Sequence, residues 1–282
     1  MVSTGKSFRL GLIGWPLLHS LSPMIHDEFF RSTGVCGEYI AYPVQPEKLS
    51  ETVSELLRSG VTGLNVTYPH KGAAACFCDE LESQARDLQV INTMKTVDGC
   101  NTGYNTDIYG FSRFIDECSL PEPFFVIGGG SAALAVDYVL HDRQLRYEMY
   151  CRNPRKWSGF ISGGELNELN DALKTADTGT VVNATTLGWG DDDVFPLDKS
   201  LLRNMVFADL NYNSSWHWRN DLLHRGVKIL TGEAMLVHQA ARSFEIWTGI
   251  LPGTATVLEM LRKKLEETKK GVIAVEYRCR LD

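Results

Sequence analysis

The sequence lacks the patterns that mark several classes of protein. It has no apolar run of about 18 residues that could span a membrane, and no apolar signal core near its beginning. Like charges never form a block of about five, and the formal net charge is -7, which disfavours a nucleic-acid partner. The seven cysteines are odd in number and form no C-x-x-C pair, which argues against structural zinc and a disulfide framework. We therefore expect a cytoplasmic protein with reduced thiols, no metal and no membrane partner, which binds small molecules or protein surfaces.

The residues that are present favour two domains of the α/β class. The 282 residues, 44% of them hydrophobic, are enough for two cores of ordinary size. Up to residue 66, short apolar runs alternate with helical patterns in a β-α-β-α-β order, which favours a mostly parallel sheet. In this part, Ser22 is the expected cap of a helix whose first residue is Pro23.

The pattern changes after Val90. Two extended runs flank Asp98-Gly99, a hairpin turn signal, so the strands there are expected to be antiparallel. After a helix capped by Thr106, alternating strands and helices from residue 124 predict a doubly wound sheet. Two later helical patterns, about 233–247 and 252–269, have no sheet of their own and are expected to return to the first domain. The closing residues, 271–282, are read as a short strand or a frayed tail.

A glycine-rich loop lies between a predicted strand and a predicted helix. Gly128, Gly130 and Ala133 fit the pattern G-x-G-x-x-G/A, which lets a pyrophosphate bind at the N-terminus of a helix. A tight turn without a ligand is the alternative. Arg152 stands near the end of the next strand, where an arginine can pair with a 2′-phosphate, so the pattern favours NADP over NAD. A solvated basic turn would explain the same residue.

The stretch GLNVTYPHKG, residues 63–72, contains a lysine that local structure does not explain. Pro69 ends the strand and is expected to set the first turn of a helix, which places Lys71 in that turn. A cation there faces the positive end of the helix macrodipole, which costs roughly 0.3–1 kcal/mol. Lys71 is therefore either an ordinary solvated lysine or a functional one.

Taken together, these motifs resemble the shikimate dehydrogenase family. The resemblance rests on GWPLLHSLSP, GLNVTYPHK, INTM with GYNTDIYG, VNATTLG and GEAMLVHQAARSFEIWTG, in that order along the chain. It implies a mixed α/β substrate domain made of residues 1–107 and 235–282, completed by the C-terminal helices. It also implies a Rossmann-type NADP-binding domain at 108–234, and an assembly that is a monomer or a homodimer.

The resemblance also implies roles for individual residues. Lys71 and Asp107 would be the catalytic pair in the reversible reduction of 3-dehydroshikimate to shikimate. The residues implied in substrate binding are Ser20, Ser22, Thr67, Asn92, Tyr212 and Gln239. Those implied in binding NADP are Gly128, Gly129, Gly130, Ser131, Ala132, Ala133, Arg152, Asn153, Arg155, Asn183, Thr185 and Gly232.

Two departures from the family pattern leave alternatives open. Trp15 replaces the usual asparagine, and Leu134 stands where the family usually has an arginine close to the cofactor phosphate. Quinate or an aminated shikimate analogue could therefore be the better substrate, and NAD could be accepted. A sensor that binds a metabolite without turnover is a further alternative, although the retained Lys71 and Asp107 count against it.

Overall fold

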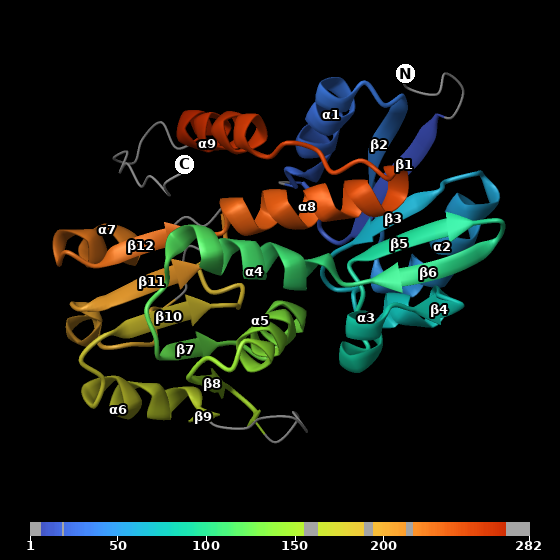
Figure 1. Ribbon diagram of the computed structural model, residues 1–282. Helices are drawn as coiled ribbons and strands as arrows, with labels where there is room; N and C mark the ends of the chain where they lie inside the picture. Colours follow the sequence, from blue (N-terminus) through green and yellow to red (C-terminus); the bar gives the residue numbers. More distant parts are fainter. Residues whose placement is uncertain (1–6, 19, 155–162, 189–193, 213–216, 269–282) are drawn as a thin grey trace. The chain divides into compact units, whose positions relative to one another are not determined.

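The computed structural model describes residues 7–18, 20–154, 163–188, 194–212 and 217–268 (Figure 1). The chain divides into two compact units. The first contains residues 1–110 and 236–264, and the second contains residues 111–235 and 265–282. All three changes of unit fall inside helices. The expected functional boundaries, 1–107 with 235–282 against 108–234, stay a prediction, and the closing residues 271–282 lie outside the described part.

The first unit contains a six-stranded sheet with the order β2-β1-β3-β5-β6-β4. The parallel pairs are β1 with β2, β1 with β3, and β4 with β6, whereas β5 runs antiparallel to β3 and to β6. The strands are β1 (Phe8–Gly14), β2 (Gly37–Pro43), β3 (Gly63–Val66), β4 (Glu80–Leu81), β5 (Thr93–Val97) and β6 (Cys100–Tyr104). Asp98 and Gly99 have φ of 51° and 82°, as a two-residue hairpin turn requires. The predicted hairpin is confirmed.

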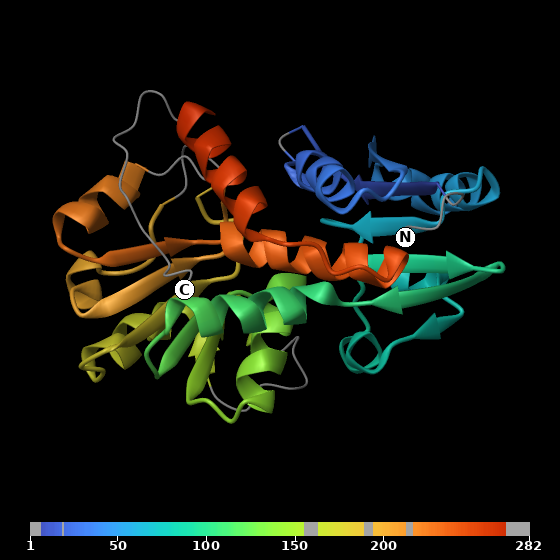
Figure 2. The same ribbon diagram turned by 45° about the horizontal axis from the view of Figure 1, so that its top comes forward.

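Helices cover both faces of this sheet. They are α1 (Ser22–Thr33), α2 (Leu49–Arg58), the short α3 (Ser83–Leu88) and α8 (Glu233–Thr248). Successive side chains of a strand point to opposite faces, so Leu64 and Val66 pack in one apolar cluster with Val53 of α2. Asn65 points to the other face. There α1 and α8 lie side by side (Figures 1 and 2). The ring centroids of Phe30 in α1 and Phe244 in α8 are 5.3 Å apart.

Two helix caps differ from the expectation. Ser22 is the first helical residue of α1, and Leu21 occupies the cap position without a side-chain hydrogen bond. Helix α4 (Thr106–Cys118) is capped by Asn105, whose Oδ1 accepts the Asp107 N–H at 3.2 Å, and not by Thr106. In both cases the expected cap lies inside the helix, one position after the cap. The presence of a serine or threonine in the sequence does not show whether that residue is the cap or the first residue of the helix.

The second unit contains a six-stranded parallel sheet with the order β12-β11-β10-β7-β8-β9. The strands are β7 (Phe124–Ile127), β8 (Tyr147–Cys151), β9 (Gly163–Glu165), β10 (Gly179–Asn183), β11 (Met205–Asp209) and β12 (Lys228–Thr231). Counted within the unit, this is the order 3-2-1-4-5-6 of a Rossmann fold, so the predicted doubly wound sheet is confirmed. The remaining α-helices of the described ranges are α5 (Ser131–Asp142), α6 (Leu169–Lys174), α7 (His217–His224) and α9 (Ala255–Thr268), of which α9 begins in the first unit.

Candidate functional site

Lys71 lies in a turn that follows β3. The expectation of an α-helix after Pro69 is wrong, because the turn leads only into a five-residue 3-10 helix, Ala73–Phe77. The turn is held from both sides: the buried His70 side chain contacts the Val44 carbonyl at 2.6 Å, and the Ile91 N–H donates to the Lys71 carbonyl at 3.0 Å. The macrodipole argument against Lys71 therefore does not apply, and another group must account for this cation.

That group is Asp107. The Lys71 Nζ lies 2.5 Å from the Asp107 Oδ2, and the two side chains are only 16% and 8% exposed. Asp107 belongs to the first turn of α4, where a carboxylate is favoured by the positive end of the macrodipole. A pair this shielded from solvent is costly to break, since the remaining charge would be left without compensation. The structure thus brings the two predicted catalytic residues together.

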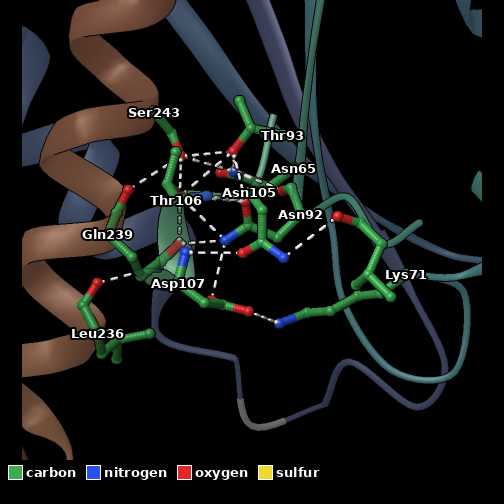
Figure 3. Close-up of polar contacts among 11 residues, drawn as sticks. Asn65, Lys71, Asn92, Thr93, Asn105, Thr106, Asp107, Leu236, Gln239 and Ser243 are labelled. Atoms are coloured by element: carbon green, nitrogen blue, oxygen red, sulfur yellow. Dashed lines mark hydrogen bonds and ion pairs between the residues drawn. The ribbon is translucent and has the colours of Figure 1, made fainter. Parts of the chain in front are cut away.

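Asn92 connects this ion pair to the interior (Figure 3). Its Oδ1 accepts the backbone N–H of Thr106 at 2.8 Å, and its Nδ2 donates to Asp107 Oδ1 at 2.9 Å. The Nδ2 also lies 3.2 Å from Oε1 of Gln239, and only 2% of the residue is exposed. Asn92 therefore braces Asp107 from within the protein. Its predicted contact with substrate stays a prediction.

Gln239 lies on α8 and faces the same cluster. Its Nε2 donates to the Leu236 carbonyl of its own helix at 2.9 Å, and its Oε1 accepts from Asn92. An amide nitrogen carries two hydrogens, so one N–H of the half-exposed Gln239 remains available for a ligand. Lys71 likewise retains donors beyond its bond to Asp107. These groups can bind hydroxyl and keto oxygens.

The other predicted substrate residues occupy three further places. Ser20 follows β1, and its Oγ accepts the Ser22 N–H at 3.4 Å; Ser22 itself is 9% exposed. Thr67 follows β3, and its N–H donates to the Ile13 carbonyl at 2.9 Å. Tyr212 belongs to the second unit, where burial raises the pKa of its phenol to about 12. Their assignment to substrate stays a prediction.

The glycine loop of the second unit joins β7 to α5. Gly128 has φ of 151°, and a Cβ there would lie 3.0 Å from both Ala133 Cβ and the Ala184 carbonyl oxygen. Gly130 is the N-cap of α5, and a Cβ on it would meet nothing within 4 Å. Gly129 and Gly130 are exposed, whereas Ser131 and Ala132 are half-buried in the first turn, which has no acidic residue. The loop therefore suits the pyrophosphate of a dinucleotide.

The remaining predicted cofactor residues fall into two groups. Arg152 and Asn153 are exposed directly after β8, and Arg155 lies outside the described residues. Asn183 is fully buried: its Nδ2 donates to Leu187 O and Asp209 Oδ1, and its Oδ1 accepts from Thr185 N and Oγ1. All four hydrogen-bonding positions of Asn183 are used, so its side chain holds the loop after β10.

Gly232 shows why some positions in this unit require glycine. A Cβ on this residue would lie 2.1 Å from the Leu210 carbonyl oxygen.

The structure also describes the two residues that depart from the family pattern. Trp15, 39% exposed, directly follows β1 and lines a groove with Tyr42 and Lys48. Leu134 lies in α5, where its N–H donates to the Gly130 carbonyl at 3.1 Å.

Sequence reasoning missed four polar residues of the first site, namely Asn65, Thr93, Thr106 and Ser243. They join Asn92 and Gln239 in one buried network (Figure 3). Two weak signals could have revealed them. Thr93 is the neighbour of Asn92, and Ser243 lies one helical turn from Gln239.

Two structural absences concern the described part of the chain. Within the described ranges, no three histidine, cysteine, aspartate or glutamate side chains are grouped so that they could hold a metal ion. None of the helices in those ranges has the length and apolar character needed to cross a membrane.

Comparison with known proteins gives consistent matches. A family model described as the shikimate dehydrogenase substrate binding domain matches residues 12–94, and one described as the shikimate 5'-dehydrogenase C-terminal domain matches residues 232–262. A shikimate dehydrogenase (NADP(+)) of Pyrococcus abyssi is 32% identical over 269 residues, covering 93% of this chain and 98% of the relative.

Solved structures agree with these matches. The crystal structure of shikimate dehydrogenase from Aquifex aeolicus has a TM-score of 0.83 and 26% identity, covering 91% of this chain and 98% of that one. The Thermus thermophilus enzyme in complex with NADP(H) and shikimate has a TM-score of 0.80 and 29% identity, covering 91% of this chain and 99% of that one. The regions matched by the two family models contain Lys71, Asn92 and Gln239.

Proposed function

Because the chain belongs to the shikimate dehydrogenase family, we propose that it catalyses the reversible, NADP-dependent conversion of 3-dehydroshikimate to shikimate, a step in the synthesis of aromatic amino-acid precursors. The observation that carries this proposal is the shielded ion pair of Lys71 and Asp107. When bound, NADPH supplies the hydride that reduces the keto carbon. The protein must then supply a proton to the oxygen of that carbon.

Lys71 is the proposed source of this proton. An ammonium group beside the keto oxygen stabilises the alkoxide charge as it develops, and it can transfer a proton to it. Asp107 holds the Lys71 side chain in place, and its own carboxylate is held by Asn92. In the oxidation direction the same lysine, once deprotonated, accepts the hydroxyl proton. Ser20, Ser22, Thr67, Asn92, Tyr212 and Gln239 are the proposed substrate-binding residues.

The second unit is the proposed NADP site. The glycine loop fits a pyrophosphate, because Gly128 and Gly130 leave the start of α5 unobstructed. The proposed residues are Gly128, Gly129, Gly130, Ser131, Ala132, Ala133, Arg152, Asn153, Arg155, Thr185 and Gly232, with Asn183 holding a loop.

We expect Arg152→Ala to raise KM for NADP by about tenfold while leaving KM for NAD nearly unchanged. A charge-assisted bond to a 2′-phosphate contributes about 1.5–3 kcal/mol, and NAD lacks that phosphate. Steady-state rates with each cofactor measure the effect. Arg146→Ala is the matched control, because Arg146 is 76% exposed and its partner Glu122 lies 3.7 Å away. Equal losses with both cofactors would show that Arg152 does not read the phosphate.

One assay tests the proposed function and its rivals. NAD(P)H absorbance is followed with shikimate or quinate, each with NADP or NAD. Turnover of shikimate with NADP supports the proposal. Faster turnover of quinate would favour a relaxed relative, for which Trp15, in place of the family's usual asparagine, is the motivating observation. Binding of shikimate without any turnover would favour a sensor and overturn the enzyme assignment.

We further propose that the protein is a cytoplasmic monomer or homodimer without nucleic-acid partners.

A further inference from the structure

Ser243 is a fully buried hydroxyl that links three separate segments of the first unit. Its Oγ lies 2.7 Å from Thr93 Oγ1 of β5, 3.0 Å from Thr106 Oγ1 of α4 and 3.1 Å from Asn65 Nδ2 of β3. The Oγ also lies 3.0 Å from the carbonyl oxygen of Gln239, one turn earlier in α8, so its single hydrogen is shared between that carbonyl and the Thr93 hydroxyl. Figure 3 shows these side chains converging around the serine. None of them was needed to explain the ion pair itself.

The cluster beside Ser243 fixes the orientation of the Asn92 amide. A backbone N–H can only donate, so the Asn92 atom 2.8 Å from Thr106 N must be Oδ1. Thr93 Oγ1 donates to the same oxygen at 3.0 Å. The Nδ2 must then point the other way, to Asp107 Oδ1 at 2.9 Å. If the amide turned over, its oxygen would face the carboxylate and repel it.

Asn65 stabilises the cluster from the other side. Tyr39, which is 6% exposed, donates its hydroxyl to Asn65 Oδ1 at 2.7 Å. The Asn65 Nδ2 is therefore directed to the Asn92 carbonyl at 3.0 Å, to Thr93 Oγ1 and to Ser243 Oγ. Asn65 thus holds both the backbone of Asn92 and the two hydroxyls beside it.

We propose that Ser243 is a positioning residue: through Thr93, Thr106 and Asn65, its hydroxyl keeps the Asn92 amide in the orientation that donates to Asp107. It acts through other residues and needs no contact with substrate. Its kinetic consequence rests on the proposed function, because a misplaced Asp107 matters for turnover only if Lys71 transfers a proton.

Removing the hydroxyl should therefore loosen Asn92. Ser243→Ala leaves Asn65 Nδ2 and Thr93 with one partner fewer in a fully buried site, where unmade hydrogen bonds are costly. The Asn92 amide then samples orientations that no longer brace Asp107. We expect kcat for shikimate oxidation to fall by about tenfold, with a smaller change in KM, since small misplacements of catalytic groups carry such losses.

Hydrogen exchange gives a readout that does not depend on turnover. The first N–H groups of a helix have no partner within the helix, so protection of the Thr106 N–H depends on Asn92 Oδ1. In Ser243→Ala we expect this amide to exchange faster, on the order of tenfold. The next amide, that of Asp107, is bonded to Asn105 Oδ1 and should keep its rate, which provides a control inside the same molecule.

Two further variants complete the experiment. Thr93→Val keeps the shape of a second member of the cluster and removes its hydroxyl. Because Thr93 lies in a strand and Ser243 in a helix, we expect substitutions in two different elements to cause the same faster Thr106 exchange and lower kcat. Thr248→Ala is the matched control: its hydroxyl donates to the Phe244 carbonyl of α8 at 2.8 Å, as Ser243 does to Gln239, but it lies outside the cluster.

The outcomes separate the inference from the proposed function. Faster Thr106 exchange and lower kcat in Ser243→Ala and Thr93→Val, but not in Thr248→Ala, support the inference. Unchanged Thr106 exchange in both variants overturns it, even if the natural protein oxidises shikimate. If the natural protein shows no turnover, the proposed function fails, and Thr106 exchange alone decides whether Ser243 positions Asn92.

Discussion

Replacing Lys71 with alanine is expected to lower kcat for shikimate oxidation by about 10²-fold or more, the range measured for the loss of a positioned acid or base. The lysine is held on both sides, by Asp107 at its Nζ and by Ile91 at its carbonyl. Water that enters the vacated space would lack this positioning. Following NAD(P)H absorbance for the natural and substituted proteins measures the effect, and shikimate binding by calorimetry tests whether the site is otherwise retained.

Lys48→Ala is the matched control for this experiment. Lys48 also forms an ion pair, with Glu51 at 3.1 Å, but its side chain is 66% exposed. Exposed pairs contribute about 0–1 kcal/mol, so activity and stability should stay close to those of the natural protein. Comparable kcat values for Lys71→Ala and Lys48→Ala would show that Lys71 has no part in proton transfer.

A second large effect concerns stability in acid. His26 is fully buried in α1, its ring stacked on Tyr39 with centroids 4.1 Å apart. Burial lowers the pKa of His26 from 6.5 to about 3, although the nearby Asn65 amide opposes part of this shift. The folded protein holds this ring neutral, whereas the unfolded chain binds a proton as soon as the pH falls below 6.5. The contribution of the neutral His26 to stability is therefore complete above pH 6.5 and is lost as the pH falls towards 3.

Between pH 6.5 and pH 5, this single residue is expected to reduce the free energy of unfolding by about 2 kcal/mol. Denaturant titrations at several pH values measure the loss. In His26→Phe the aromatic packing is kept and the protonation is removed, so that part of the pH dependence should disappear. The exposed His141 provides the control, His141→Gln, which should follow the natural protein. Identical pH profiles for His26→Phe and the natural protein would contradict the assignment to His26.

Local signals in the sequence predicted much of the fold. Asp98-Gly99 is a turn that few other residue pairs can make, and the structure confirms both the turn and the antiparallel pairing it imposes. The order of strands and helices after residue 124 likewise predicted the doubly wound sheet. Each turn, strand and helix of these features is marked by a pattern of neighbouring residues, so a single sequence is enough to predict them.

The errors arose where distant contacts decide the local structure. A proline after an apolar strand is compatible with a helix or with a turn, and His70 and Ile91 hold Lys71 in the turn. Thr106 is a suitable cap by type, but Asn105 takes that place while Asn92 binds the Thr106 N–H. No local pattern could show which of two adjacent polar residues would meet a side chain from another strand.

The candidate site shows the same limit. Lys71 and Asp107 were found through motifs, and the structure places them in contact. The network behind them joins residues 65, 93, 106 and 243, which no periodicity connects. Gln239 was assigned to substrate binding through the resemblance. Part of the hydrogen bonding of its amide is met inside the protein, by Leu236 and Asn92.

The return of the chain in α8 has a consequence for biosynthesis. Residues 65–107 of the site leave the ribosome long before Gln239 and Ser243, because residues 111–235 of the second unit are made in between. Domains generally fold as they are synthesised, so the parallel sheet of the second unit can form while the first sheet still lacks its α8. During that interval α8 cannot yet supply its contacts to Asn65, Thr93 and Asn92. The nascent protein therefore acquires the support behind its catalytic pair only when the helix near its end is made.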